Sequence, residues 1–188
     1  IVFGDWSSDV CSSDLRRSLA ASTYNSLRAD CQEAVERLRA WCSSLTSLRD
    51  VTPEFLQAHL SDLPERVGRR ALHVVGEMTR VEQAIGCLVE NDSVGFGALM
   101  LATHVSLRDL YGVSCPELDM LGDLASSHPA CFGARLTGAG FGGCTVNLVS
   151  RNGLEDFVRW LKAAGLEKIG HEVPIEVCYA VDGAHTVI

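Results

Sequence analysis

A glycine-rich segment spanning residues 135–144 has the residue types that could bind a phosphate group. It reads Arg-Leu-Thr-Gly-Ala-Gly-Phe-Gly-Gly-Cys. Because glycine has no Cβ and tolerates positive φ, consecutive backbone N–H groups can point into one concavity, which an anion can approach closely. The sequence therefore predicts a phosphate-contacting loop, with a plain glycine hairpin between two strands as the alternative. The residues of this glycine loop are Gly138, Ala139, Gly140, Phe141, Gly142 and Gly143.

Two common phosphate-binding motifs do not fit this loop. The P-loop motif needs a lysine followed by serine or threonine after its glycines, but Cys144 and Thr145 follow here. Gly138, Gly140 and Gly143 match G-x-G-x-x-G, yet residues 144–149 have the pattern of a strand where a dinucleotide-binding fold requires a helix. A Rossmann interpretation is therefore rejected.

Other polar side chains have simpler structural explanations. His104, Arg108 and Asp109 lie at helical spacing and could do acid–base chemistry, but we expect them to orient the helix packed behind the glycine loop. Cys144 has no activating base beside it in the sequence, so we expect a packed thiol. The histidines and cysteines form no motif with metal-ligand spacing, and we predict no metal ligands in this chain.

Apolar residues spaced three and four apart predict helices upstream of the loop. Thr52-Pro53 is a typical helix start, Asn91-Asp92-Ser93 ends one helix and caps the next, and Ser114-x-x-Glu117 predicts a capping box. The expected helices cover residues 23–45, 52–59, 67–88, 94–110 and 116–126.

The apolar pattern changes at the loop. Residues 132–137 and 144–149 predict two antiparallel strands, and residues 154–161 predict a helix that stops at Gly165. Residues 173–181 and 184–188, separated by Asp182-Gly183, predict a terminal hairpin. The fold class is therefore α+β, with helices packed on a small antiparallel sheet of four strands.

Composition limits the classes of partner. The chain has 188 residues, 47% of them hydrophobic, which is enough for a buried core. Its formal net charge of −8 argues against nucleic acid and anionic membrane surfaces, which both require a positive field. The eight cysteines lack C-x-x-C spacing and are expected to be reduced, so we expect a cytoplasmic protein.

Residues 1–15 differ from the rest of the chain. The stretch from Asp5 to Leu15 has neither helical nor strand periodicity, and it is a translation of a common sequencing-adapter oligonucleotide. We therefore expect residues 1–15 to be a sequencing artefact and disordered, with the natural domain covering residues 16–188. An ordinary serine-rich terminal loop is the alternative.

Several segments lie in a fixed order around the glycine loop. They are Arg17-Ser-Leu-Ala-Ala-Ser-Thr-Tyr24, Arg28-x-x-Cys31, Ser47-Leu-Arg-Asp-Val51, His73-Val-Val-x-Glu77, His104-x-Ser-Leu-Arg-Asp-x-Tyr111 and Val113-Ser-Cys-Pro-Glu-Leu-Asp119. Together with the glycine loop, these segments resemble the galactokinase branch of the GHMP kinase family. The resemblance runs from Arg16 to the C-terminus and is specific, because no generic fold requirement places these motifs at these distances from the glycine loop.

The resemblance implies a GHMP-kinase C-terminal domain and transfer of the ATP γ-phosphoryl group to the anomeric hydroxyl of galactose or a related sugar. It implies that the catalytic Asp, the nucleotide-binding glycine–serine loop and the Mg²⁺ ligands lie in an N-terminal half that is missing here, so we expect no catalytic residue and no turnover in this chain. It also implies that Tyr24 contacts the sugar, that the glycine loop supports the nucleotide phosphates, and that the protein is monomeric.

Two alternatives stay open at this point. Ala139 stands where galactokinases most often have glycine, as in some related N-acetylgalactosamine kinases, so the sugar could be N-acetylgalactosamine or arabinose. The chain could also belong to a galactose sensor on the same fold that acts by binding a partner protein.

Overall fold

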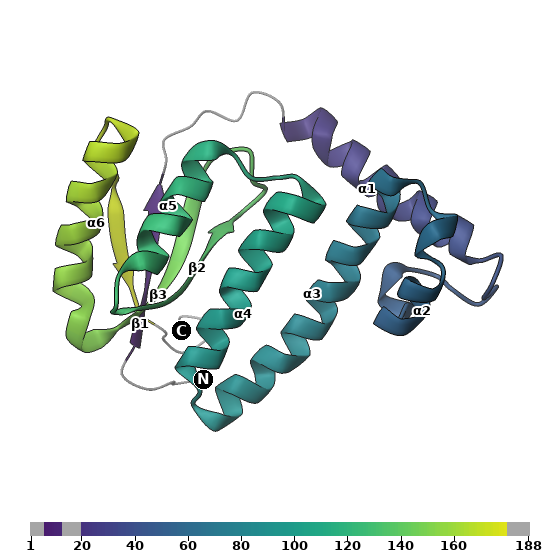
Figure 1. Ribbon diagram of the computed structural model, residues 1–188, viewed down its shortest axis with the longest axis horizontal. Helices are drawn as coiled ribbons and strands as arrows, with labels where there is room; N and C mark the ends of the chain where they lie inside the picture. Colours follow the sequence, from purple (N-terminus) through teal and green to yellow (C-terminus); the bar gives the residue numbers. More distant parts are fainter. Residues whose placement is uncertain (1–5, 13–19, 180–188) are drawn as a thin grey trace, which may run out of the picture.

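The computed structural model describes residues 6–12 and 20–179, with side chains from residue 23 onward. Figure 1 shows the sheet with α5 and α6 at one end, α1 and α2 at the other, and the antiparallel pair α3 and α4 between them. The α-helices are α1 Ala20–Leu38, α2 Pro53–Ala58, α3 Glu65–Glu90, α4 Ser93–Ser106, α5 Pro116–Ser127 and α6 Leu154–Ile169. The short helical turns are η1 Leu48–Asp50, η2 Leu60–Asp62, the π-helical η3 Leu107–Tyr111 and η4 Arg151–Gly153. The strands are β1 Trp6–Ser12, β2 Cys131–Thr137, β3 Cys144–Ser150 and β4 Ile175–Cys178.

The strands form one antiparallel sheet in the order β2-β3-β1-β4. β2 and β3 pair from Cys131 opposite Val149 to Thr137 opposite Cys144, so the glycine loop closes their hairpin. Helices α5 and α6 cover one face of this sheet, where Phe157 is fully buried with Ala134 and Val149. Helices packed on a small antiparallel sheet are the α+β arrangement that the sequence predicts.

β1 was not expected from the sequence. Residues 6–12 pair with both β3 and β4, with Trp6 opposite Ser150 and Ser8 opposite Cys178. The expectation of disorder is therefore wrong for these residues, because a β-ladder is held by backbone N–H and C=O groups and does not require a side-chain period. The adapter origin of residues 1–15 stays a prediction. In the expected terminal hairpin, β4 is observed, while residues 184–188 lie outside the described residues.

α4 lies along β2 because two glycines allow their backbones to touch. A Cβ on Gly97 would collide with the carbonyl of Phe132, and a Cβ on Gly133 would collide with the backbone of Gly97. This close approach holds the first half of α4 beside the start of β2, the strand that leads into the glycine loop.

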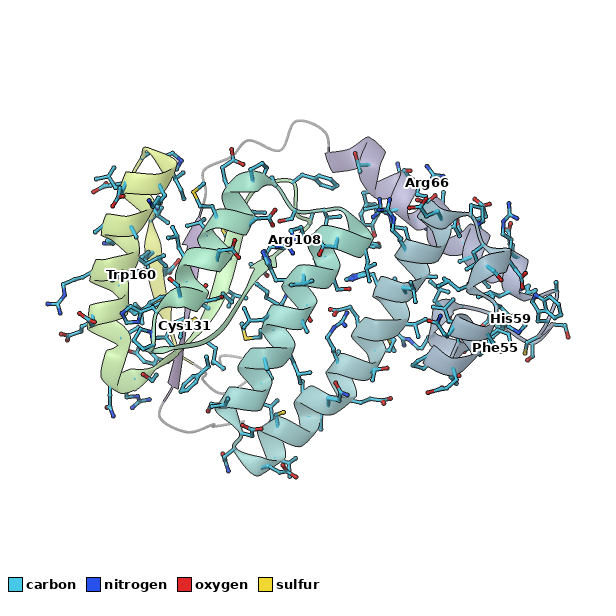
Figure 2. All side chains as sticks on the ribbon, viewed as in Figure 1. Phe55, His59, Arg66, Arg108, Cys131 and Trp160 are labelled. Carbon is cyan, nitrogen blue, oxygen red and sulfur yellow. The ribbon has the colours of Figure 1, made fainter. Side chains whose placement is uncertain are left out.

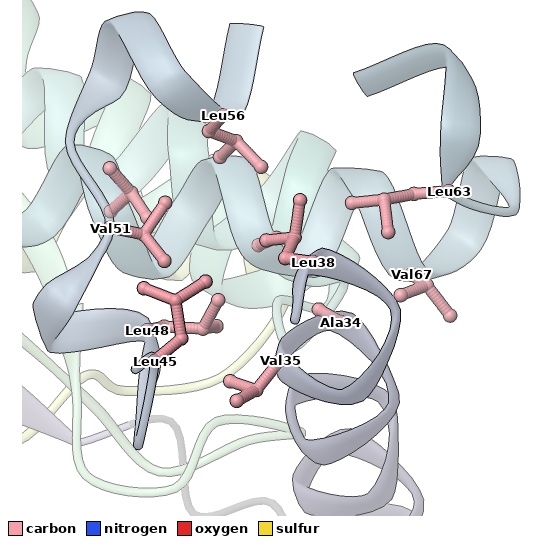
Figure 3. Close-up of a cluster of buried hydrophobic side chains, with 11 residues drawn as sticks. Ala34, Val35, Leu38, Leu45, Leu48, Val51, Leu56, Leu63 and Val67 are labelled. Carbon is pink, nitrogen blue, oxygen red and sulfur yellow. The ribbon is translucent and has the colours of Figure 1, made fainter. Parts of the chain in front are cut away.

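The helical end of the molecule has its own apolar cluster. Figure 3 shows its side chains converging from α1, the turns that follow it, and α3. Leu38 and Ala71 are fully buried there, and Leu56 is 1% exposed. α1 ends at Leu38, seven residues earlier than predicted, because the chain turns back so that Arg39 Nε donates to the Leu45 carbonyl (2.8 Å) while Leu45 itself is buried in the cluster.

Two further helix ends differ from expectation, and two agree with it. The Ser114 capping box is wrong, because Cys115 is the N-cap of α5 and the Ser114 hydroxyl donates to Asp119 Oδ1 (2.5 Å) instead. α6 continues through Gly165 to Ile169 and ends at Gly170, since Gly165 is needed inside the helix where a Cβ would press on Val173. The caps at Thr52 and Asp92 are confirmed: their side chains accept from Phe55 N (3.2 Å) and Gly95 N (2.8 Å).

Across the described residues, no helix is both long enough and apolar enough to cross a membrane.

Candidate functional site

The glycine loop has a backbone conformation that few sequences could adopt. Five of its six residues have positive φ, namely Gly138 (80°), Gly140 (77°), Phe141 (58°), Gly142 (120°) and Gly143 (99°). Positive φ is costly for residues with a Cβ and nearly free for glycine, so the glycine positions follow from the path of the chain. Phe141 is the exception, and its strain must be compensated by its contacts.

Contacts with the segment before α5 hold the tip of the loop in place. The Phe141 N–H donates to the carbonyl of Val113 (2.7 Å), and a Cβ on Gly140 would collide with that same carbonyl. The Phe141 ring packs against the apolar cluster formed by Leu27, Val113, Leu118 and Leu136. The Phe141 N–H is thus hydrogen-bonded within the protein and is not available to an anion.

Tyr24 lies at the start of α1 and is 59% exposed. One turn later on the same helix, Leu27 is buried in the cluster that receives Phe141. The structure therefore brings the beginning of α1 and the glycine loop against one apolar cluster, and leaves the Tyr24 side chain accessible. No contact between Tyr24 and the loop is among the described interactions, so its contact with a sugar stays a prediction.

A polar network supports the segment that receives the loop. Arg70 of α3 donates to the carbonyl of Leu110 (2.7 Å) and lies over the Tyr111 ring. Asp30 is 3% exposed. Its carboxylate forms an ion pair with the Arg66 guanidinium (2.9 Å), and its Oδ2 lies 3.9 Å from Arg70 Nε. A buried carboxylate needs such partners, so α1, α3 and η3 are fixed relative to one another.

His104, Arg108 and Asp109 do not form an acid–base group. His104 is buried, and its Nδ1 accepts from the backbone N–H of Leu136 (3.1 Å) in β2. Arg108 and Asp109 pair with each other at the surface beyond the end of α4, where Figure 2 labels Arg108. The structural role expected from the sequence is confirmed for His104, which joins α4 to the strand before the loop.

Cys144 and Arg135 flank the glycine loop. Cys144 is a partly buried, free thiol at the start of β3. Arg135 donates to the neighbouring Leu136 carbonyl (3.1 Å) and lines a groove of about 190 Å³ together with Glu77, Arg80 and Thr103. The guanidinium of Arg135 is therefore directed toward α3 and α4.

Chemically, the glycine loop offers backbone N–H donors. Gly138 and Ala139 are exposed at the start of the loop, where main-chain N–H groups could meet a phosphate oxygen. In the part of the chain that the structure describes, no group of three or more His, Cys, Asp or Glu residues gathers closely enough to hold a metal ion.

Sequence reasoning missed Val113 as the residue on which the loop rests. Its carbonyl receives Phe141 and limits Gly140, a role that depends on backbone placement and not on side-chain type. The only available signal was the occurrence of Val113-Ser-Cys-Pro-Glu at a set distance before the loop.

The family model for the C-terminal domain of GHMP kinases matches residues 84–166, which include His104 and the whole glycine loop. Residues 84–166 therefore carry the sequence pattern of a GHMP kinase C-terminal domain. This match assigns the α4–β2–loop–β3 unit described above to that domain.

Curated galactokinases are similar to this chain over nearly its whole length. The galactokinase of Roseiflexus sp. is 46% identical over 95% of the chain, and that of Homo sapiens is 42% identical over 93%. A crystal structure of Lactococcus lactis galactokinase complexed with galactose superimposes with a TM-score of 0.88 at 31% identity, over 94% of the chain. Mevalonate kinase of L. major, at 22% identity and a TM-score of 0.61, shares the fold.

The chain spans about half the length of the curated relatives it matches. It covers 46% of the Roseiflexus protein, 42% of the human protein and 46% of the Lactococcus lactis chain.

Proposed function

We propose that this chain is the C-terminal part of an ATP-dependent galactokinase, which transfers the γ-phosphoryl group of ATP to the anomeric hydroxyl of galactose. The observation that carries the proposal is 46% identity to a galactokinase over 95% of the chain. The TM-score of 0.88 to a galactokinase complexed with galactose supports it. We extend the proposal to a monomeric, cytoplasmic parent protein, as the sequence predicts.

In this proposal the glycine loop lies at the floor of the active site and supports the nucleotide phosphates. Phosphoryl transfer depends mainly on positioning and on charge stabilisation, which preorganised backbone donors supply without moving. The exposed Gly138 and Ala139 are the candidate donors to a phosphate or sugar oxygen. Phe141 instead anchors the loop, because its N–H is donated to Val113.

Tyr24 is the residue of this chain that we propose to contact the sugar. Its exposure of 59% and its place one turn from Leu27 support the assignment, since Leu27 packs in the cluster that also receives Phe141. A sugar held between the start of α1 and the loop would present a hydroxyl to the Tyr24 ring edge or phenol oxygen.

The catalytic Asp, the nucleotide-binding glycine–serine loop and the Mg²⁺ ligands are proposed to lie in the part of the parent that this chain does not span. Mg²⁺ would neutralise charge on the phosphates. The described residues of this chain gather no carboxylate cluster that fits such an ion, so we assign none of them to it.

A chimeric enzyme tests the proposal. Residues 16–188 replace the matching part of the Roseiflexus galactokinase, and ADP release is measured with ATP, Mg²⁺ and galactose. We expect galactose-dependent ADP release from the chimera and none from this chain alone. A chimera that is folded by circular dichroism but forms no ADP with galactose would contradict the proposal, as would turnover by this chain alone.

A sugar panel decides between galactose and its relatives. Galactose, N-acetylgalactosamine and arabinose are compared with the chimera and with its Ala139→Gly variant. We expect galactose to give the highest kcat/KM. A preference for N-acetylgalactosamine that Ala139→Gly abolishes would assign the other sugar.

A further inference from the structure

One polar chain joins the base of the glycine loop to its tip. At the base, the N–H of Leu136 donates to His104 Nδ1 (3.1 Å). At the tip, the N–H of Phe141 donates to the carbonyl of Val113 (2.7 Å). Ser114 directly follows Val113, and its hydroxyl donates to Asp119 Oδ1 (2.5 Å), the atom that lies 3.4 Å from His104 Nε2.

The hydrogen bond from Leu136 determines the tautomer of His104. Because Nδ1 is an acceptor, the neutral ring must carry its proton on Nε2, which then faces Asp119. The distance of 3.4 Å is long for a hydrogen bond, and within the described part of the chain Nε2 has no hydrogen-bond partner, so the attraction between His104 and Asp119 is electrostatic. Protonation of Nδ1 would turn the acceptor into a donor and break the bond to Leu136.

The surroundings of His104 favour the neutral ring. Burial lowers the pKa of His104, and nearby Arg108 lowers it further, while Asp119, Asp123 and Asp109 raise it. α5 makes room for the ring, since a Cβ on Gly122 would lie only 3.0 Å from Nε2.

We propose that His104 is a positioning residue for the glycine loop: by accepting from Leu136 and attracting Asp119, it ties the end of β2 to the Val113–Ser114 segment on which the loop tip rests. The loop is rich in glycine and exposed at Gly138 and Ala139, so its order depends on the contacts at its base and at its tip. The consequence for phosphate binding rests on the proposed function, but the effect on loop order does not.

A second histidine at the opposite end of β2 provides a matched control. His128 is also buried, its Nδ1 accepts from the backbone N–H of Ala130 (3.2 Å), and its Nε2 lies 3.4 Å from Asp156. The two residues share the same kind of bonds, but His128 is connected to the start of the strand and His104 to the end that enters the loop.

The test compares three variants of this chain by amide hydrogen exchange. His104→Asn keeps an acceptor near the position of Nδ1, His104→Gln keeps only a group near Nε2, and His128→Gln removes the control bond. We expect His104→Gln to raise the exchange rate of the loop amides, with Phe141 as the reporter, at least about tenfold. His104→Asn should stay within about threefold of the unmodified chain, and His128→Gln should affect Ala130 and leave the loop unchanged.

A nitrogen chemical shift and a substitute variant complete the test. The ¹⁵N shift of His104 Nδ1 in the unmodified chain should be that of an unprotonated acceptor nitrogen. If His104→Gln does not fold, Ser114→Ala takes its place, because loss of the hydroxyl from Asp119 should raise loop exchange by a smaller factor. Unchanged loop exchange in the folded variants, or an equal rise in His104→Gln and His128→Gln, would overturn the proposal. Neither result depends on kinase activity.

Discussion

Gly140 shows how one absent side chain sets the shape of the candidate site. Its φ of 77° disfavours any residue with a Cβ, and that Cβ would also collide with the Val113 carbonyl. Gly170, at the end of α6, has a similar φ of 88° but nothing within 4 Å of its Cβ position. Comparing substitutions at Gly140 and Gly170 therefore separates the cost of backbone strain from the cost of steric collision.

We predict that Gly140→Ala destabilises the chain far more than Gly170→Ala. The control should cost about 1 kcal/mol for the left-handed backbone alone. Gly140→Ala should cost at least about 2 kcal/mol more, because the loop must move off Val113 and Phe141 loses its anchor. Urea denaturation measures both values. Equal losses would mean that the loop does not rest on Val113 in solution.

His73 shows how burial sets protonation in this fold. It is 6% exposed, its Nδ1 lies 2.8 Å from Ser106 Oγ, and its ring stacks on Tyr111. Burial lowers its pKa from 6.5 to about 4, although nearby Glu77 acts in the opposite direction. The folded state therefore holds His73 neutral at pH values where the unfolded chain would bind a proton.

This difference predicts a loss of stability in mild acid. Between pH 6.5 and about 4 the unfolded state binds more protons at this site, so the free energy of unfolding falls as the pH is lowered. From pH 7 to pH 5 the contribution of His73 should be about 2 kcal/mol. Urea denaturation at both pH values, with His73→Gln as the reference that lacks the titrating group, measures it. A pH dependence of the same size in His73→Gln would assign the loss to other groups, and an NMR titration of the His73 ring checks the pKa directly.

Among the elements, α3 illustrates where apolar spacing predicts too much burial. The first half of its stripe is buried, with Val67 at 1%, Ala71 at 0% and Val75 at 3% exposure. The second half is in solvent, since Val81 is 58% and Ile85 57% exposed. The sequence predicts one continuous amphipathic face, but α1 and α2 cover only its N-terminal half (Figure 3).

We predict that Val75→Ala and Val81→Ala differ strongly in their effect on stability. Both gain the same helix propensity, so the difference reports burial alone. Val75→Ala should cost about 2 kcal/mol through lost apolar burial and a small cavity, while Val81→Ala should change stability by less than about 0.5 kcal/mol. Thermal or urea unfolding measures the difference. A large loss in Val81→Ala would indicate that another molecule covers this face in solution, which analytical ultracentrifugation would detect.

Element positions were predictable where local signals coincide. Thr52-Pro53 and Asn91-Asp92 mark helix boundaries with caps that depend only on neighbouring residues, and both predictions hold. Predictions failed where a distant contact changed the outcome. Ser114 donates to Asp119 and does not cap α5, while Gly165 stays in α6 because Val173 lies against it.

At the scale of the whole molecule, two apolar clusters lie at opposite ends of the structure. Leu38 belongs to the cluster of α1, α2 and α3, and Phe157 to the one between α5, α6 and the sheet (Figure 1). The cluster of Leu27, Val113, Leu118 and Leu136 is separate from both and receives the glycine loop. In this third cluster, Leu27 comes from α1 at the helical end, and Leu136 comes from β2 in the sheet. The glycine loop is therefore supported by residues from both ends of the molecule.

We predict that Leu38→Ala and Phe157→Ala act independently. Each removes a fully buried side chain and should cost about 2–5 kcal/mol. Their effects should add within about 0.5 kcal/mol, because the two residues share no partner. Denaturant unfolding of both single variants and the double variant measures this. A double variant whose loss departs clearly from the sum would show that the clusters are coupled through α3 and α4.

The sequence by itself determined the α+β class, the helix-then-hairpin order and the glycine loop, because these depend on local spacing, capping residues and the conformational freedom of glycine. Only the tertiary structure decided that Val113 and His104 hold the loop, that Phe141 N–H is occupied, and that half of the α3 stripe is exposed. Backbone carbonyls such as that of Val113 are the same in every residue type, so no sequence pattern marks the one that a distant loop will reach. β1 follows the same principle, since residues without strand periodicity complete a ladder that backbone groups alone can form.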